Sequence, residues 1–269
     1  MKIIDSHVHL YPDEVKRDEF VAGYVAQNRL DYTESGLLSH MRAFKVSHSL
    51  VISSRFLNNE YTINLAKRHP QKFSAALTLW RAQNEARAIP KLIQQLTNKE
   101  VKAVKFYLGY RPINVRDKKW RPIYKSAIKL DKPVIFHTGD TLYETARLKY
   151  AHPLVLDDLA VDFPSLKIVI AHFGNPWILD ASEIVYKNKN VYADLSAFFA
   201  GPWTPQPHLL RRVAEAIEHC GPEKLMFGSD YPVARIDESL KFIKMLKFSN
   251  TGKKAVFGET AAKVYNLPI

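Results

Sequence analysis

Short apolar runs rich in β-branched residues recur eight times along this chain, and this recurrence constrains the fold more than any other feature. Each run is followed by a polar loop and then by a segment with helical periodicity, at a spacing of roughly 30 residues, near the size of one βα unit. We expect strands at 2–10, 48–54, 73–80, 101–108, 133–138, 166–172, 191–196 and 224–228. Strands that alternate with helices predict a parallel sheet, and eight of them predict a (β/α)8 TIM barrel, a single α/β domain over residues 1–269.

The segments between the strands carry helix signals. Helices are expected at 34–44, 58–69, 84–97, 120–130, 153–163, 181–186, 207–220 and 237–247, with a C-terminal helix at 259–266. A longer polar stretch, residues 11–33, predicts an extended loop after the first strand. Pro122 fits the first turn of its helix, whereas Pro90 lies inside its helix and indicates a kink or a later start. A doubly wound open sheet is the alternative, but no Gly-x-Gly-x-x-Gly turn supports it.

The composition argues against a membrane protein, a disulfide-bonded protein and a nucleic-acid-binding protein. The chain has neither a signal segment nor a run of 18 apolar residues, which predicts a cytoplasmic protein with no membrane association. Cys220 is the only cysteine, so no intrachain disulfide can form, as expected in a reducing compartment. The net charge is +12, but lysine and arginine are scattered along the chain and no nucleic-acid-binding motif is present. We therefore expect no nucleic-acid partner.

Polar side chains stand where several of the predicted strands end. On the first strand, His7 and His9 project to the same side, and two imidazoles so placed can hold one metal ion, although His-x-His alone is a weak signal. The polar residues at the ends of later strands are Lys105, His137, His172 and Asp230. In a barrel these ends meet at one face, and buried polar groups there are costly unless they bind something. The pattern therefore predicts a metal site.

Together these motifs resemble the amidohydrolase superfamily, and the residues around them are similar to those of its amidohydrolase-2 branch. The matching stretches are Ile-Asp-Ser-His-Val-His-Leu (4–10), His-Pro with Leu-Asp-Asp-Leu-Ala and Phe-Pro (152–164), Ile-Ala-His-Phe-Gly-Asn-Pro-Trp (170–177) and Phe-Gly-Ser-Asp-Tyr-Pro (227–232). The resemblance covers essentially the whole chain. The closing helix reads Gly-Glu-Thr-Ala from 258 to 261 where the family usually has Gly-Asn-Ala-Ala, a change we expect to matter for structure only.

The resemblance implies roles for the strand-end residues. One divalent metal would be bound by His7, His9, His137 and Asp230. Three nitrogens and one carboxylate suit Zn²⁺, with Mn²⁺, Fe²⁺ or Co²⁺ as alternatives and a second metal left open. Asp230 is the first candidate for the general base that takes a proton from a metal-activated water. His172 would face this water or the substrate as a catalytic acid/base or polarising group, with the role of ligand to a second metal as its alternative.

Lys105 distinguishes subtypes within the superfamily. Binuclear amidohydrolases carry a carboxylated lysine that bridges two metals at the end of strand 4, and TatD-type deoxyribonucleases carry a glutamate there. In many amidohydrolase-2 members a lysine at this point serves without a second metal. In this chain the predicted strand 4 has the sequence Val-Lys-Ala-Val-Lys-Phe-Tyr, residues 101–107. We expect Lys105 to bind a substrate anion, with a carboxylated bridge and structural ion pairing as the alternatives, and the absence of a carboxylate disfavours a nuclease.

Residues around the predicted rim suggest how a substrate would be held. Arginines follow strands 2, 3 and 4, at Arg55, Arg81 and Arg111, and their forked guanidinium groups match carboxylates. Solvated loop arginines are the alternative reading. Aromatic candidates for pocket walls, each equally able to be packing residues, are Tyr107, Trp177, Trp203 and Tyr231. As substrate-binding residues we select Lys105, Arg55, Tyr107 and Trp177.

These features favour an enzyme that hydrolyses a lactone, amide or ester of a small carboxylic acid. The first alternative is non-oxidative decarboxylation of an aromatic or unsaturated acid at the same metal site, because the resembling branch includes such lyases. A TatD-like metal-dependent nuclease and a catalytically inactive barrel that binds a metabolite are the remaining alternatives. The oligomeric state stays open, with a homodimer as one candidate.

Overall fold

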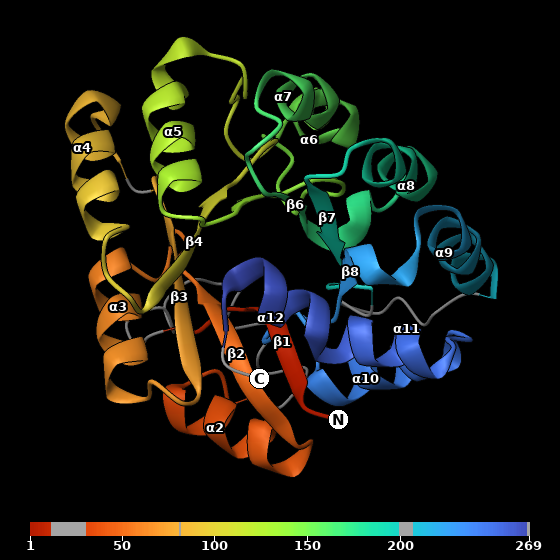
Figure 1. Ribbon diagram of the computed structural model, residues 1–269. Helices are drawn as coiled ribbons and strands as arrows, with labels where there is room; N and C mark the ends of the chain where they lie inside the picture. Colours follow the sequence, from red (N-terminus) through yellow and green to blue (C-terminus); the bar gives the residue numbers. More distant parts are fainter. Residues whose placement is uncertain (12–30, 81, 199–206, 268–269) are drawn as a thin grey trace.

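The structure, a computed structural model, describes residues 1–11, 31–80, 82–198 and 207–267. Its centre is one sheet of eight parallel strands whose spatial order equals their order in the chain (Figure 1). The strands are β1 (Ile3–Val8), β2 (Val46–Ile52), β3 (Phe73–Thr78), β4 (Val101–Phe106), β5 (Val134–Phe136), β6 (Ile168–Ile170), β7 (Val191–Asp194) and β8 (Leu225–Met226). All eight expected strands are present, which confirms the predicted TIM barrel.

The barrel closes where the first and last strands meet. The Ser6 N–H donates to the Phe227 carbonyl at 2.9 Å, and beyond the end of β8 the Asp230 N–H donates to the His7 carbonyl at 2.8 Å. Val8 also forms a parallel bridge with Tyr231. Since β8 itself has only two residues, this contact depends largely on the loop that follows it, and it fixes that loop against β1.

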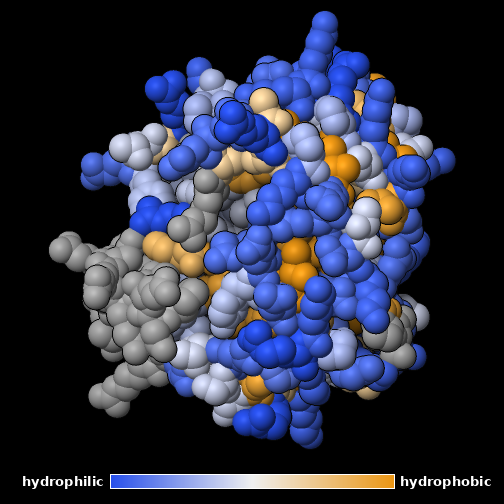
Figure 2. Space-filling view, turned by 90° about the vertical axis from the view of Figure 1, so that its left-hand side faces the viewer, coloured by the Kyte–Doolittle hydropathy of each residue, from blue (hydrophilic) through white to orange (hydrophobic). Residues whose placement is uncertain are grey.

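Helices surround the sheet (Figure 1). They are α2 (Glu34–Ala43), α3 (Asn59–Arg68), α4 (Glu85–Gln95), α5 (Arg121–Lys129), α6 (Leu148–Ala151), α7 (Asp157–Asp162), α8 (Ile178–Lys187), α9 (Pro207–Cys220), α10 (Ile236–Met245), α11 (Asn250–Lys254) and α12 (Thr260–Tyr265). Several begin at polar caps: the Asn58 side chain accepts a hydrogen bond from Tyr61 N–H, and that of Asn84 from Arg87 N–H. Figure 2 shows the face with α3 and α4, where apolar patches lie among mostly hydrophilic side chains.

Some predicted boundaries were wrong. Helix α4 begins at Glu85 with Pro90 inside it, so this proline does not delay the start. The segment predicted as one helix at 153–163 is divided into a 3-10 turn, Pro153–Leu156, and the short α7. The closing helix α12 lies within the predicted range 259–266, but the helical segment before it was not predicted: Ser249 caps α11, and a π-helical turn, Ala255–Glu259, joins α11 to α12. The predicted loop at 11–33 lies mostly outside the described residues.

The core has two parts, one inside the barrel and one between the barrel and its helices. Interior side chains such as Leu50, Ile52 and Met226 form one cluster together with Ala261 and Tyr265 of α12. Helix α12 thus closes the amino end of the barrel, and chemistry is left to the carboxyl end. Among the described residues, no helix combines the length and the hydrophobicity needed to cross a membrane.

Candidate active site

Three predicted metal ligands meet at the carboxyl end of the barrel. His7 and His9 lie on and just after β1, and both are buried. Asp230 follows β8 in a left-handed backbone conformation, with φ of 66°, and its Oδ1 atom lies 3.5 Å from His7 Nε2 and 3.4 Å from His9 Nε2. Ligand atoms of these three residues all lie within 4.8 Å of one another, which is close enough for one ion to contact them together.

The outer nitrogens of both histidines have partners that suit this role. His9 Nδ1 lies 3.0 Å from the Ile52 carbonyl, and because a carbonyl only accepts, the hydrogen belongs on Nδ1. His7 Nδ1 lies 2.9 Å from Asp194 Oδ2. Each Nε2 is then left with a lone pair that faces Asp230, and burial lowers the pKa of His7 well below its usual value, which favours the neutral ligand form. The donor set fits a divalent metal such as zinc.

His137 stands beside this cluster and not in it. Its Nε2 atom faces the Asp140 carbonyl at 2.9 Å, and its Nδ1 lies 3.1 Å from His172 Nε2. Burial lowers the pKa of His137 to about 3, so its ring is neutral. The role of His137 as fourth metal ligand therefore stays a prediction.

His172 occupies a strained turn directly after β6. Its φ is 60° and that of Phe173 is 43°, values that side chains other than glycine rarely adopt. The His172 N–H donates to Asp194 Oδ1 at 2.9 Å, and the ring Nδ1 lies 2.8 Å from Ser196 Oγ. Burial, followed by the neighbouring His7, lowers the pKa of His172 well below its usual value. This turn directs the His172 ring into the same pocket as the metal ligands.

Lys105, the last residue but one of β4, lies in the same pocket. Its side chain is only 1% exposed, and its Nζ atom lies 3.5 Å from His7 Nε2. Burial is the main reason that the pKa of Lys105 falls to about 8. A buried amine at this distance from a candidate metal ligand is placed to contact either a substrate anion or, as a carboxylated lysine, a metal.

Around these groups lies a pocket with a largely aromatic wall. Besides the polar groups described above, the pocket is lined by Tyr11, Ser54, Arg55, Phe56, Trp80, Tyr107, Tyr110, Leu142, Tyr143 and Val233. Arg55 lies over the rings of Phe56 and Tyr143, at 4.4 and 5.1 Å from their centroids. The Tyr107 hydroxyl donates to the Ser53 carbonyl at 2.7 Å. The structure thus brings Lys105, Arg55 and Tyr107 together at the pocket.

Other predicted rim residues are not in this lining. Trp177 packs against His152, with ring centroids 4.7 Å apart. Arg111 bonds the Leu79 carbonyl and forms an ion pair of 2.7 Å with Glu85, so it acts structurally. Tyr231 is fully buried and bonds the Asp31 carbonyl. Arg81 and Trp203 lie outside the described residues.

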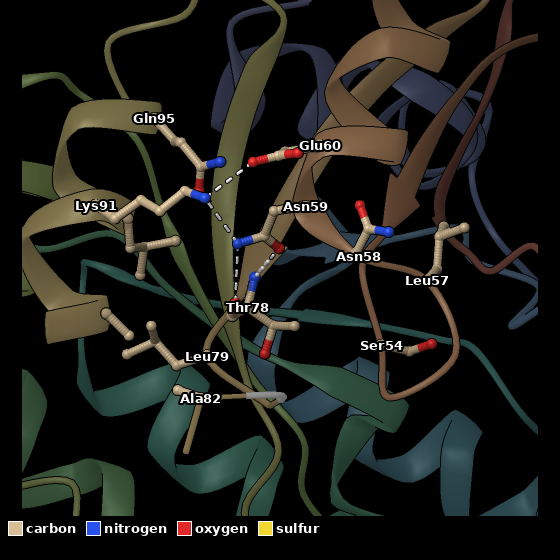
Figure 3. A pocket seen from close by; sticks show the side chains of 12 residues that line it. Ser54, Leu57, Asn58, Asn59, Glu60, Thr78, Leu79, Ala82, Lys91 and Gln95 are labelled. Carbon is tan, nitrogen blue, oxygen red and sulfur yellow. Dashed lines mark hydrogen bonds and ion pairs between the residues drawn. The ribbon is translucent and has the colours of Figure 1, made fainter. Parts of the chain in front are cut away.

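A second cavity, of about 330 Å³, lies between α3 and α4 and shares Ser54 with the pocket (Figure 3). Its polar groups bond mainly to one another. The Asn59 amide pairs with both backbone groups of Thr78 at 3.0 Å, and Lys91 pairs with Glu60 at 2.9 Å. These bonds connect β3, α3 and α4, so the polar residues that line the cavity stabilise the packing of these elements.

Four residues that contact the site were not predicted from the sequence. Asp5 accepts hydrogen bonds from Ser229 N–H at 2.9 Å and Ser229 Oγ at 2.7 Å, and burial raises its pKa to about 7. Tyr110 packs its ring 4.7 Å from that of His137. Asp194 and Ser196 lie against His7 and His172. A signal for Asp194 was present, because an aspartate at the end of an apolar strand is seldom buried without partners.

A closed parallel barrel with a His–His–Asp cluster at its carboxyl end is the arrangement expected of a metal-dependent TIM-barrel enzyme. The amidohydrolase family model (Amidohydro_2) matches residues 4–267, and the chain belongs to this family. It is accordingly an enzyme of the amidohydrolase type, that is, a metal-dependent hydrolase or carbon–carbon lyase. No curated protein matches the chain significantly.

Solved structures of three other proteins share the fold. An amidohydrolase from Burkholderia multivorans with bound zinc is 19% identical, with a TM-score of 0.77 and 100% of both chains covered. The 2,6-dihydroxybenzoate decarboxylase from Rhizobium is 17% identical, with a TM-score of 0.75 and 99% of both chains covered. A probable 2-pyrone-4,6-dicarboxylic acid hydrolase from Acinetobacter baumannii, with citric acid bound, is 18% identical, with a TM-score of 0.70 over 99% of this chain and 100% of that one.

Proposed function

We propose that this protein is a metal-dependent hydrolase that opens a lactone, amide or ester of a small carboxylic acid. The observation that carries the proposal is the position of Asp230, whose Oδ1 lies 3.5 and 3.4 Å from the Nε2 atoms of His7 and His9. A carboxylate so placed can contact a metal held by both histidines and also accept a proton from a water beside it.

The metal is proposed to be Zn²⁺, with Mn²⁺, Fe²⁺ or Co²⁺ as alternatives. When bound, it would lower the pKa of a coordinated water toward about 7 and polarise the substrate carbonyl. His7 and His9 would hold it through Nε2, because their Nδ1 atoms face Asp194 and the Ile52 carbonyl. Asp230 takes the proton of the attacking water.

A proton must then reach the leaving oxygen or nitrogen. His172 faces the pocket on the side of His137, with its Nε2 3.1 Å from His137 Nδ1. Asp230 would hold the proton taken from the water, and His172 is the residue placed to accept this proton at its Nε2 and pass it to the leaving atom. His137 either completes the metal ligands or supports His172, and the activity of its variants will distinguish these roles.

The substrate is proposed to carry a carboxylate and a flat ring. Lys105 and Arg55 are cationic groups in the pocket wall, and both can pair with a carboxylate. Trp80, Tyr107 and Tyr110 supply aromatic surface. Two of the structurally similar proteins support this chemistry, since one is a probable 2-pyrone-4,6-dicarboxylic acid hydrolase and the other a 2,6-dihydroxybenzoate decarboxylase.

Decarboxylation of an aromatic acid is the second candidate. It is favoured by the same aromatic wall, which would suit a benzoate ring, and by Lys105, whose amine could hold the departing carboxylate. Both reactions place a carboxylate in one pocket, and they differ in whether water is added.

Product analysis in labelled water separates the two reactions. The metal-loaded enzyme is incubated with a panel of lactone carboxylic acids, carboxylate esters and hydroxybenzoates, in H₂¹⁸O and separately in D₂O. Hydrolysis adds one ¹⁸O to the product and releases no CO₂. Release of CO₂ together with deuterium on the ring carbon would refute the hydrolase and support the decarboxylase. Asp230→Asn should abolish hydrolysis, and the exposed His208→Gln should not change it.

A further inference from the structure

We propose that Asp194 is the positioning residue of this site, because its two carboxylate oxygens set the hydrogen positions of His7 and His172. One oxygen would prepare the metal ligand and the other the acid/base residue. The inference rests on the proposed function for the role of His172, whereas the hydrogen positions can be tested without any substrate.

The first half of the proposal concerns Oδ2 of Asp194. Asp194 ends β7 and is fully buried, as is His7 on β1, and only the short β8 lies between these two strands. Their Nδ1–Oδ2 distance is 2.9 Å, whereas Ser196 Oγ is 3.5 Å from the same nitrogen, so the carboxylate is the partner of His7. A hydrogen on Nδ1 leaves the lone pair on Nε2, the atom that faces Asp230 and Lys105.

The second half concerns Oδ1 of the same carboxylate. Oδ1 lies 2.9 Å from the His172 backbone nitrogen and 3.2 Å from that of Ser196. A backbone N–H can only donate, so Oδ1 is an acceptor and carries no hydrogen. The Ser196 hydroxyl lies 2.5 Å from Oδ1 and must therefore donate to it.

The direction of the Ser196 hydroxyl determines which hydrogen bond the His172 ring can form with it. Since the only hydrogen of the Ser196 hydroxyl is directed at Asp194, its oxygen can only accept from His172 Nδ1, which lies 2.8 Å away. His172 Nε2 lies 3.1 Å from His137 Nδ1, which is also an acceptor because His137 Nε2 faces the Asp140 carbonyl, so a neutral His172 can donate to only one of these two partners. The bond to Ser196 is the shorter one, at 2.8 Å, and we assign the hydrogen to Nδ1 and the lone pair to Nε2. Asp194 thus acts directly on His7 and, through Ser196, on His172.

Asparagine at position 194 separates this proposal from a general structural role. Its amide has one acceptor and one donor group, so it cannot accept on both sides. If the amide nitrogen faces His7, the hydrogen of His7 moves to Nε2 and the ligand is lost. If the amide nitrogen faces the backbone N–H groups of His172 and Ser196, hydrogen-bond donors face one another and these bonds are lost. Ser196→Ala is the matched control, because it removes only the hydroxyl that links Asp194 to the His172 ring and keeps the bond between His7 and Asp194.

The experiment combines Zn²⁺ affinity with ring protonation. Metal-free protein is titrated with Zn²⁺ against a chromophoric chelator, and two-bond ¹H–¹⁵N spectra of histidine-labelled protein identify the protonated nitrogen of each ring. We expect Asp194→Asn to bind Zn²⁺ 10- to 100-fold more weakly, the range found when groups that orient metal ligands are removed. Ser196→Ala should bind within twofold of wild type and should change only the His172 signals.

Two results would overturn the proposal. One is Zn²⁺ affinity in Asp194→Asn within twofold of wild type. The other is a wild-type spectrum that shows neutral His7 or neutral His172 protonated at Nε2. If Asp194→Asn does not fold, the wild-type and Ser196→Ala spectra still decide. Neither measurement uses a substrate, so failure of the proposed hydrolase activity leaves the inference standing.

Discussion

His7 Nδ1 lies 2.9 Å from Asp194 Oδ2, although 187 positions separate the two residues in the chain. The contact joins β1 to β7, the two strands that flank the short β8, and Asp230 and Lys105 approach the opposite nitrogen of the same ring. One imidazole therefore connects the candidate metal site with a buried carboxylate that no substrate needs to touch. The stability of the fold and the geometry of the site are coupled through this ring.

Gly228 leaves the space that the His7 side chain requires. A Cβ atom at this glycine would lie 3.0 Å from both His7 Cβ and Ser196 Cβ, closer than ordinary packing allows. We expect Gly228→Ala to displace His7, to cost about 1 to 3 kcal/mol in the free energy of unfolding, and to weaken Zn²⁺ binding at least tenfold, on the order seen for loss of ligand orientation. Urea unfolding of the metal-free protein and chelator competition measure the two effects.

The matched control is Gly252→Ala, on α11, where the added Cβ would meet Pro222 Cγ at 3.1 Å. This position is crowded in a similar way but is not part of the site, so Zn²⁺ affinity should not change. Unchanged Zn²⁺ affinity in Gly228→Ala would contradict the assigned role of this glycine.

Lys105→Met tests whether this amine binds substrate. The substitution keeps an apolar chain of similar length and removes the charge 3.5 Å from His7 Nε2. If Lys105 pairs with a substrate carboxylate, KM should rise roughly 10- to 100-fold, which corresponds to the ~1.5–3 kcal/mol of a hydrogen bond to a charged group. The metal content should stay at one per chain. A wild type with two metals per chain in bicarbonate, and a loss of one in the variant, would instead show a carboxylated bridge.

Tyr265→Phe should stabilise the protein. The Tyr265 hydroxyl is buried inside the amino end of the barrel and has no hydrogen-bond partner among the described residues. Its removal should raise the free energy of unfolding by about 1 kcal/mol, since an unsatisfied buried hydroxyl costs free energy. Tyr124→Phe is the matched comparison, because the Tyr124 hydroxyl donates to the Val115 carbonyl at 2.8 Å, and its loss should destabilise by about 1 kcal/mol. A destabilised Tyr265→Phe would show that the hydroxyl has a partner after all.

His48 makes stability depend on pH away from the active site. Burial lowers its pKa from 6.5 to about 4, so the folded ring stays neutral in the range where the unfolded ring binds a proton. The unfolded chain holds more protons between these values, and stability must fall as the pH drops from 6.5 to 4, by at most about 3 kcal/mol. Relative to wild type, His48→Gln should lose about 2 kcal/mol less between pH 7 and pH 5 in urea unfolding of metal-free protein.

His208→Gln removes an exposed histidine and should leave this pH dependence as it is in wild type. If His48→Gln and wild type lose stability equally on acidification, His48 is not buried as described.

The sequence was sufficient to predict the barrel because eight apolar runs at βα spacing leave few other architectures. The same logic placed His7, His9, Lys105, His172 and Asp230 correctly at one end, since parallel strands share the direction in which they end. It worked best for residues on strands or in the first few positions after them, because the sheet fixes where these positions lie.

Residues in loops were harder to place, because nothing in their local pattern determines how a loop folds over the barrel. Tyr110 and Phe56 line the pocket without a motif to mark them, while Trp177 packs against His152 instead. Asp194 was missed for another reason. Its partners His7 and Ser196 become neighbours only when the barrel closes, and periodicity along one strand does not reveal a contact across it.

The most direct test of the account is the metal content of the purified protein. After dialysis with Zn²⁺ and removal of excess ion, elemental analysis should give one Zn²⁺ per chain for wild type and for His208→Gln. The His9→Ala and Asp230→Asn variants should hold much less than one, while circular dichroism shows them folded. A wild type without bound metal, or His9→Ala and Asp230→Asn variants that keep a full equivalent, would contradict the site built from His7, His9 and Asp230.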